Sequence, residues 1–226
     1  MAVSPEDLAA CAWGVPAKPE SRWPATLAVI AAILLYVTLP ERLTFGPTWL
    51  LPVLEAAVIL PLFIDAPRRD ASEQLWHRIA SIALIALVNA ANLISLVLLI
   101  RGLLEGRGAE ARELIFAAVQ IWLTNVIVFG LWYWELDRGG PSARCLHTHR
   151  EPDFLFPQMS TPAIAPPGWY PRFLDYLYVA FTNATAFSPT DTLPLSRWAK
   201  LAMTFESAVS IVVVALVIAR AINILG

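Results

Sequence analysis

Long apolar runs separated by short polar stretches dominate the chain, and this pattern predicts membrane-spanning helices. A helix needs roughly 20 mostly apolar residues to cross a bilayer, and five segments reach or approach that length. Their expected ranges are 23–39, 48–64, 79–104, 111–134 and 198–225. Tryptophans lie at many segment ends, including the cluster Trp132-Tyr133-Trp134, as expected for amphipathic rings that anchor at the headgroup level. The pattern therefore predicts an all-α integral membrane protein with about five transmembrane helices.

The region between the fourth and fifth segments is not uniform. Residues 136–171 form a long proline-rich loop that is too polar and too broken to span a bilayer. The stretch that follows, "RFLDYLYVAFTNATAF", is apolar for only about a dozen residues, a length typical of an interfacial or re-entrant helix. A polar stretch, "SPTDTLP", comes next. Irregular backbone at membrane depth is tolerated only where protein buries it or water lines it. We therefore expect a re-entrant pore-type helix and loop here.

From residue 111 onward, this order of elements resembles the pore module of the potassium-channel superfamily. That family has an outer helix, a pore helix, a Thr-Val-Gly-Tyr-Gly-Asp filter, a proline and an inner helix. Here residues 111–134 match the outer helix and 175–184 the pore helix, while Asp191 and Pro194 match the Asp and the proline after the filter. The segment "RWAKLAMTFESAVSIVVVALVIARAI" looks like a bacterial inner helix. The resemblance implies an ion-channel-like homotetramer in a bacterial inner membrane.

This resemblance divides the chain into two regions, a three-helix membrane region at 1–110 and the pore module at 111–226. The first region does not resemble a voltage sensor, because it has too few helices and no arginine ladder. Lys and Arg are divided equally between the two sides of the predicted topology, so charge does not orient the chain. The resemblance would place the long loop outside and the C-terminus in the cytoplasm.

The sequence departs from the family at the filter. The positions that would line the pore are Thr185, Ala186, Phe187, Ser188, Pro189, Thr190 and Asp191. No glycine occurs between Gly168 and Gly226, although a potassium filter needs backbone carbonyls aimed at the ion and glycines that reach positive φ. Pro189 cannot take that role, because its ring fixes φ near −65°. Selectivity would instead come from hydroxyl groups and from a ring of Asp191 carboxylates, which favours cations in general.

Several ionisable and amide side chains lie inside the predicted helices. An ionisable group at membrane depth usually faces a partner or water. Glu206 is either a pore-lining or filter-supporting carboxylate, or a hydrogen-bonded group near the interface, and Asp175 is expected to support the pore helix by capping its first turn. Glu55 either serves an ion or proton or pairs with Asn89 or Asn92. These asparagines, like Asn125, are the residue type that hydrogen-bonds between membrane helices, and their positions follow from the sequence.

The loop motif "CLHTH" raises the question of a metal site. Cys145, His147 and His149 carry thiolate and imidazole groups that suit zinc. The spacing Cys-x-His-x-His is not an established zinc motif, so an ordinary polar loop is the favoured interpretation. We expect no metal and no cofactor.

Composition agrees with a membrane protein, and the sequence lacks features of nucleic-acid-binding proteins and of common enzyme classes. Of the 226 residues, 58% are hydrophobic and 15% charged, against about 45–50% and about 25% in soluble domains. The net charge of −2 and the absence of a basic patch argue against nucleic acid. No nucleophile elbow or phosphate loop points to an enzyme. The sequence thus predicts a weakly selective cation channel whose partners are lipid, inorganic cations and copies of itself. The alternative is a non-conducting membrane scaffold or regulator that keeps the pore-loop fold.

Overall fold

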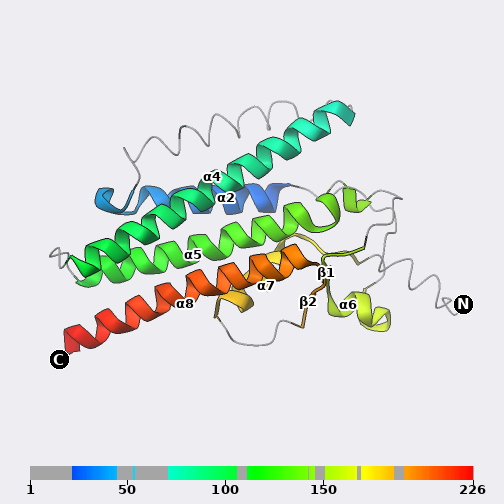
Figure 1. Ribbon diagram of the computed structural model, residues 1–226. Coiled ribbons are helices and arrows are strands. Elements are labelled where there is room, and N and C mark those ends of the chain that lie inside the picture. Colours follow the sequence, from blue (N-terminus) through cyan, green and yellow to red (C-terminus); the bar gives the residue numbers. More distant parts are fainter. Residues whose placement is uncertain are drawn as a thin grey trace, which may run out of the picture. The chain divides into compact units, whose positions relative to one another are not determined.

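The computed structural model describes residues 22–44, 53, 71–105, 111–141, 143–145, 151–166, 169–185 and 191–225. Within these ranges the chain is mostly helical (Figure 1). The longer helices are α2 (Trp23–Val37), α4 (Ala71–Leu104), α5 (Ala111–Leu136), α7 (Phe173–Thr185) and α8 (Arg197–Leu225). The short elements are η1 (Glu41–Leu43), η2 (Asp137–Gly139), η3 (Ala143–Cys145), β1 (Phe154–Leu155), α6 (Pro157–Ser160), η4 (Pro162–Ile164) and β2 (Leu193–Pro194).

Three of the helices are long and apolar enough to cross a membrane. Their apolar spans are Arg78–Leu104 in α4, Arg112–Gly139 in α5 and its end, and Arg197–Arg220 in α8. They correspond to the third, fourth and fifth segments predicted from the sequence, and they support the prediction of a helical membrane protein. The first predicted segment is the apolar helix α2, which has 15 residues. The second, 48–64, lies outside the described residues except for Val53.

Local sequence explains where these helices begin and end. Helix α8 starts after Ser196, whose hydroxyl oxygen accepts a hydrogen bond from the Ala199 N–H at 3.3 Å, as in an N-cap. Helix α5 stops where the backbone turns to positive φ at Arg138 (53°), Gly139 (85°) and Gly140 (98°). Glycine is favoured at such positions because it has no side chain to clash. At Gly140 an added Cβ would lie 2.9 Å from the Glu135 carbonyl oxygen.

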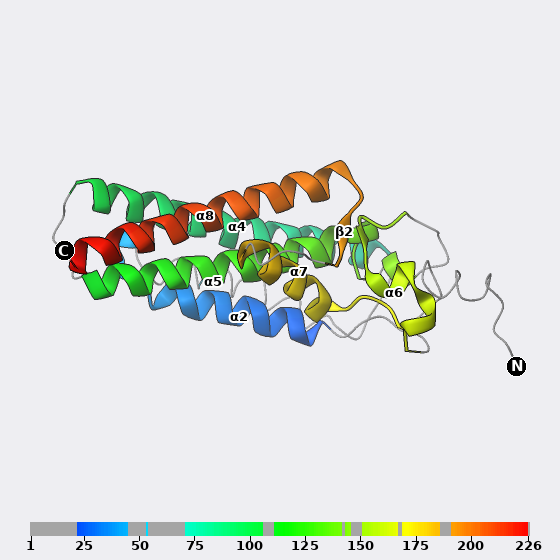
Figure 2. The same cartoon turned by 90° about the horizontal axis from the view of Figure 1, so that it is seen from below.

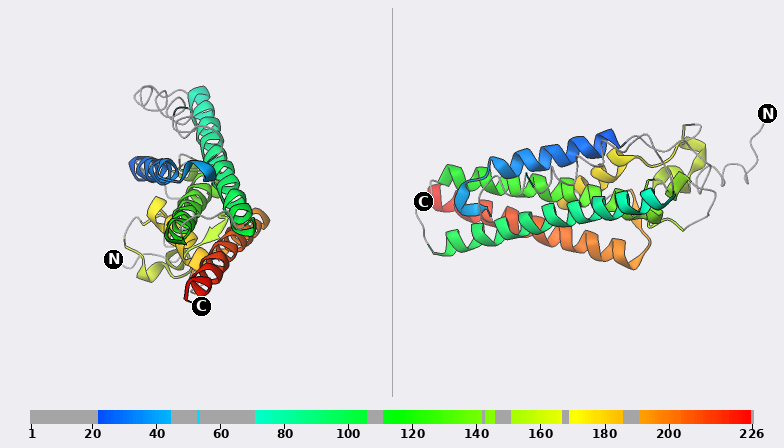
Figure 3. Two further views of the ribbon diagram at one scale, coloured as in Figure 1. Left: turned by 90° about the vertical axis from the view of Figure 1, so that its left-hand side faces the viewer. Right: turned by 90° about the horizontal axis from the view of Figure 1, so that it is seen from above.

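The described residues fall into two compact units. The helix unit contains those of Leu27–Val128 and Ala208–Gly226. Side chains from α2, η1, α4, α5 and α8 form its apolar core, and the ribbons of these elements can be followed in Figure 3. Its buried members are Tyr36, Leu39, Leu43, Ala91, Leu96, Leu99, Leu114, Ala117, Ala118, Ile121, Val209 and Val213. Because most of these are aliphatic, the unit is held mainly by packing between helices.

The second unit, called the long-loop unit below, contains the described residues of Met1–Thr26 and Phe129–Ser207. Strands β1 and β2 pair antiparallel, with Phe154 opposite Pro194 and Leu155 opposite Leu193, beside the start of α8 (Figure 1). The core is aromatic, and the Phe154 ring contacts those of Tyr133, Tyr176 and Trp198 at centroid distances of 5.0, 6.1 and 5.8 Å. The short pairing thus ties residues 154–155 to residues 193–194, which follow the predicted filter.

Helix α7 lies against the C-terminal part of α5 (Figure 2). The contact is close because α5 has a glycine there, and an added Cβ on Gly130 would lie 3.0 Å from Leu177 Cα. Small residues allow membrane helices to approach in this way. The α7 side chains Phe173, Tyr176, Val179, Ala180 and Ala184 are buried. One face of this 13-residue helix is therefore packed within the long-loop unit.

Candidate functional site

Two elements of the long-loop unit, α7 and β2, flank the predicted filter in the sequence. Thr185 is the last residue of α7, and Asp191 is an exposed residue shortly before β2. The predicted filter positions Ala186, Phe187, Ser188, Pro189 and Thr190 lie outside the described residues. The site is therefore described below by the residues that hold the two ends of this segment.

The first anchor holds the C-terminal end of α7 and centres on Glu206 of α8. Glu206 Oε2 accepts a hydrogen bond of 2.6 Å from the Tyr133 hydroxyl of α5. The same oxygen accepts a second hydrogen bond of 2.6 Å from Asn183 Nδ2 of α7. Asn183 Nδ2 also donates to the Met203 carbonyl at 2.9 Å, and the Ser207 hydroxyl donates to Asn183 Oδ1 at 3.1 Å. A single carboxylate thus joins three helices two residues before α7 ends.

The first anchor is enclosed by protein. Glu206 and Tyr133 are both 0% exposed, and Asn183 is partly buried. A polar group buried in this way is costly unless it is hydrogen-bonded. The hydroxyl and amide donors meet that requirement, and they also fix the direction in which Asn183 points. The arrangement can hold the end of α7 in one position relative to the adjacent turns of α5 and α8.

The second anchor holds the segment after the predicted filter and centres on Asp153. Asp153 Oδ1 accepts a hydrogen bond of 2.6 Å from the indole N–H of Trp198, which lies in the first turn of α8. Its Oδ2 accepts one of 3.0 Å from the backbone N–H of Arg138. The Asp153 carbonyl accepts another of 2.8 Å from the Leu195 N–H, next to β2. Asp153 therefore contacts the end of α5, the residue after β2 and the start of α8.

Asp137, at the end of α5, extends this second anchor to α7. Asp137 Oδ1 accepts a hydrogen bond of 2.8 Å from the Asp153 N–H, and Oδ2 accepts one of 2.5 Å from the Tyr176 hydroxyl of α7. Arg138 Nε also donates to Oδ2 at 3.2 Å. The Arg144 guanidinium lies over the Tyr176 ring at 5.0 Å. Within the second anchor, the Asp137 carboxylate is thus paired with the Arg138 guanidinium.

Burial sets the protonation of the tyrosine in this anchor. Tyr176 is fully buried, and burial raises its pKa well above the ordinary value. The nearby Asp137 carboxylate acts in the same direction, because a second negative charge beside it is unfavourable. Tyr176 is therefore a neutral hydrogen-bond donor, which fits its role in holding Asp137.

Asp175 lies in the first turn of α7, as the sequence placed it. Its Oδ2 accepts a hydrogen bond of 2.7 Å from the backbone N–H of Arg172, which precedes the helix. This is the backward-reaching half of a capping box. Burial is the largest influence on the Asp175 pKa and raises it, while the Arg172 N–H and charge oppose that shift.

The asparagines singled out in the sequence lie in the helix unit. Asn92 Nδ2 of α4 donates to the Ile121 carbonyl of α5 at 3.2 Å. Asn125 Nδ2 of α5 donates to the Ser210 hydroxyl of α8 at 3.1 Å. Asn89 is a half-buried residue of α4, and Glu55 lies outside the described residues. The two hydrogen bonds join helices, which is the usual function of asparagine between membrane helices.

Of the weak metal candidates, Cys145 lies in η3, and His147 and His149 are outside the described residues. Across the described part of the chain, no three His, Cys, Asp or Glu side chains gather as metal ligands do.

Sequence reasoning missed most of the residues in the two anchors. The sequence predicts that aromatic residues at segment ends, such as Tyr133, anchor at the interface, but it gives no sign that the polar atoms of Tyr133 and Trp198 bond carboxylates. Asp153 falls within the proline-rich loop that the sequence predicts at 136–171. The signal that could have found it is the alternation in "DFLF", where buried Phe154 and Phe156 flank Leu155 as in a short strand.

Comparison with models of known protein families, with curated proteins and with solved structures gives no match to this chain, so its function is inferred from the site alone.

Proposed function

We propose that four copies of the chain form a weakly cation-selective pore in a membrane. Residues 185–191 of each copy line this pore. The observation that carries this proposal is the held end of α7. The short helix α7 ends directly before a polar stretch of the sequence, and Glu206 accepts hydrogen bonds from Tyr133 and Asn183 that hold this end to two longer helices. A pore loop requires this kind of rigid support, because its lining has to stay in register around an axis.

Helix lengths support the proposal. The 13 residues of α7 correspond to about 20 Å at about 1.5 Å per residue, which is less than the hydrocarbon thickness of about 30 Å. Helices α5 and α8, which flank α7 in the chain, are long enough to cross. A segment that enters with α7 would therefore turn at membrane depth, and its backbone would need protein or water around it.

Charge supports cations as the permeant ions. The C-terminal end of a helix carries partial negative charge from its free carbonyl groups, and α7 ends at Thr185, directly before the proposed lining. Asp191, at the other end of the lining, is an exposed carboxylate. Rings of Asp or Glu favour cations in channels. Both ends of the segment thus disfavour anions.

The composition of the lining argues against strong potassium selectivity. The segment has no glycine, and Pro189 fixes one φ and removes one N–H. The carbonyl ladder of a potassium filter needs positive φ angles, which glycine reaches readily, so this composition disfavours such a ladder. Side-chain hydroxyl groups and carboxylates then act on the ion, and these discriminate weakly between sodium and potassium.

Assembly from several copies follows from having one such segment per chain. Only 28% of the apolar span of α8 is buried, against 61% of that of α5, so α8 has much apolar surface left to contact lipid or another copy. Closed cyclic symmetry would bring the α8 helices and the polar segments around one axis.

Ion flux from proteoliposomes tests this function. We expect the purified wild-type chain to release both sodium and potassium, and Asp191→Asn to release them more slowly. Glu151→Gln is the matched control, because Glu151 is an exposed carboxylate outside the segment, and it should behave as wild type. Flux that is absent for both ions would favour the alternative of a non-conducting scaffold or regulator, in which Phe187 and Pro189 close the axis.

A further inference from the structure

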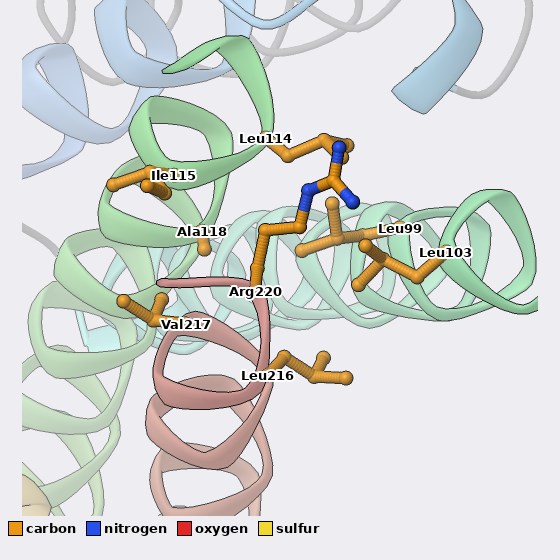
Figure 4. Close-up of a pocket in the computed structure, with 8 residues that line it drawn as sticks. All are labelled: Leu99, Leu103, Leu114, Ile115, Ala118, Leu216, Val217 and Arg220. Carbon is orange, nitrogen blue, oxygen red and sulfur yellow. The ribbon is translucent and has the colours of Figure 1, made fainter. Parts of the chain in front are cut away.

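A pocket in the helix unit is lined by apolar side chains and by one positively charged side chain, Arg220. Its lining includes Leu99 and Leu103 of α4, Leu114 and Ile115 of α5, and Leu216 and Arg220 of α8. The empty space is about 200 Å³, part of it open to the surroundings. Figure 4 shows the Arg220 side chain extending from α8 towards Leu114 and Leu99. The pocket therefore combines a hydrocarbon surface with one guanidinium group.

One donor of the Arg220 guanidinium lacks a partner in the described part of the chain. Its buried Nε has no hydrogen-bond partner among the described residues. Another arginine of the same unit, Arg42, forms an ion pair of 2.6 Å with Glu113. A guanidinium stays charged at all physiological pH values, and a buried donor without an acceptor is unfavourable. Arg220 is thus suited to an acceptor from outside the chain.

The position of the pocket along the helices indicates where that acceptor comes from. The apolar span of α8 ends at Arg220, that of α4 ends at Leu104 and that of α5 begins at Arg112. The ends of membrane spans lie at the level of the lipid headgroups. Arg112 is an exposed residue near the same helix ends, and it adds positive charge.

From this combination we propose that the pocket binds an anionic phospholipid. The phosphate accepts hydrogen bonds from the Arg220 guanidinium, whose planar fork matches phosphate oxygens. An acyl chain lies on Leu99, Leu103 and Leu216. Basic pockets between membrane helices are known to take anionic headgroups. The proposal does not rest on the proposed pore, because it is argued only from residues of α4, α5 and α8 that line the pocket.

Native mass spectrometry of the purified full chain tests this site, with phosphatidylglycerol and phosphatidylcholine as the two probes. We expect wild type to retain phosphatidylglycerol in preference to phosphatidylcholine. Arg220→Gln should weaken phosphatidylglycerol binding about fivefold, the factor expected for one cation at a membrane surface, and should remove the preference. Arg220→Lys keeps the positive charge and should keep part of the preference for phosphatidylglycerol.

Arg101→Gln is the matched control, since it removes an exposed arginine of α4 outside the pocket, and it should leave the preference unchanged. Unfolding temperatures of all variants separate lipid binding from misfolding. Equal retention of the two lipids by wild type would mean that Arg220 only reaches the surface and takes any headgroup. That result, or a preference that survives in a folded Arg220→Gln, would overturn the proposal. Displacement of the lipid by inorganic phosphate would overturn the assignment to a phospholipid.

Discussion

At the residue scale, Glu206 is a carboxylate of α8 that is fully buried. Its two hydrogen bonds of 2.6 Å come from Tyr133 and Asn183. In Glu206→Leu both donors lose their acceptor, and each unsatisfied buried group costs about 1–3 kcal/mol. Because Asn183 keeps its bond to the Met203 carbonyl, we expect a loss of roughly 2–4 kcal/mol in unfolding free energy.

The isosteric variant Glu206→Gln separates hydrogen bonding from mere size at this position. It keeps one acceptor oxygen, so its loss should be clearly smaller than that of Glu206→Leu. Denaturant unfolding in detergent, followed by tryptophan fluorescence, measures both. Equal losses in the two variants would show that the side chain is held by packing alone, and that the proposed anchor does not depend on its oxygen.

At the element scale, the start of α7 depends on Asp175, which accepts a hydrogen bond from the Arg172 N–H. Burial raises the Asp175 pKa above its ordinary value, so the folded state favours the protonated carboxyl. The stability that this shift contributes is fully present below the ordinary pKa and is lost as pH rises through the raised pKa. Relative to Asp175→Asn, wild type should therefore become less stable as pH rises through the acidic range.

Thermal unfolding of both proteins at a series of acidic pH values measures this difference. The effect should be small, because Asp175 is only partly buried and the Arg172 N–H opposes the shift. Asp175→Ala removes the capping acceptor as well, and it should lose about 0.5–2 kcal/mol. A wild type that gained stability over Asp175→Asn with rising pH would show that the cap outweighs burial.

The packing of α7 on α5 gives a second prediction at this scale. A Cβ on Gly130 would lie 3.0 Å from Leu177 Cα, a backbone atom that moves only if α7 moves. We expect Gly130→Ala to lower the unfolding free energy by about 1–3 kcal/mol, as overpacking does. Gly102→Ala is the control, because nothing lies within 4 Å of its added Cβ, and alanine favours a helix over glycine. Comparable losses at both positions would contradict the close approach.

The sequence predicts elements of this protein better than it predicts their connections. Apolar runs predicted α4, α5 and α8, because a membrane helix satisfies its backbone internally and needs only length and hydropathy. Residues such as Asp137 and Asp153 join through tertiary contacts across 16 positions. The sequence around each of these residues does not indicate which distant residue it contacts. The capping position of Asp175 could be predicted, since a capping box is local.

At the scale of the whole molecule, the proposed pore requires assembly. In a chain with Cys11 and Cys145 replaced by serine, Ile211→Cys introduces a thiol at an exposed position of α8 (61% exposed). Around a symmetry axis these thiols come close together, so oxidation in lipid should give dimers of crosslinked chains. Val119→Cys on α5 is the control, because the outer helix would face lipid. Monomers alone for both variants would count against assembly through α8.

Planar-bilayer recording measures the weak cation selectivity proposed for residues 185–191. Purified protein is reconstituted with potassium on one side and sodium on the other, and the reversal potential is measured for wild type and Asp191→Asn. We predict a reversal potential near zero, with smaller currents in Asp191→Asn because it removes the negative charge at one end of the lining. A reversal potential near the potassium equilibrium value would contradict the inference drawn from the missing glycines, and a bilayer that stays silent under all conditions would contradict the pore itself.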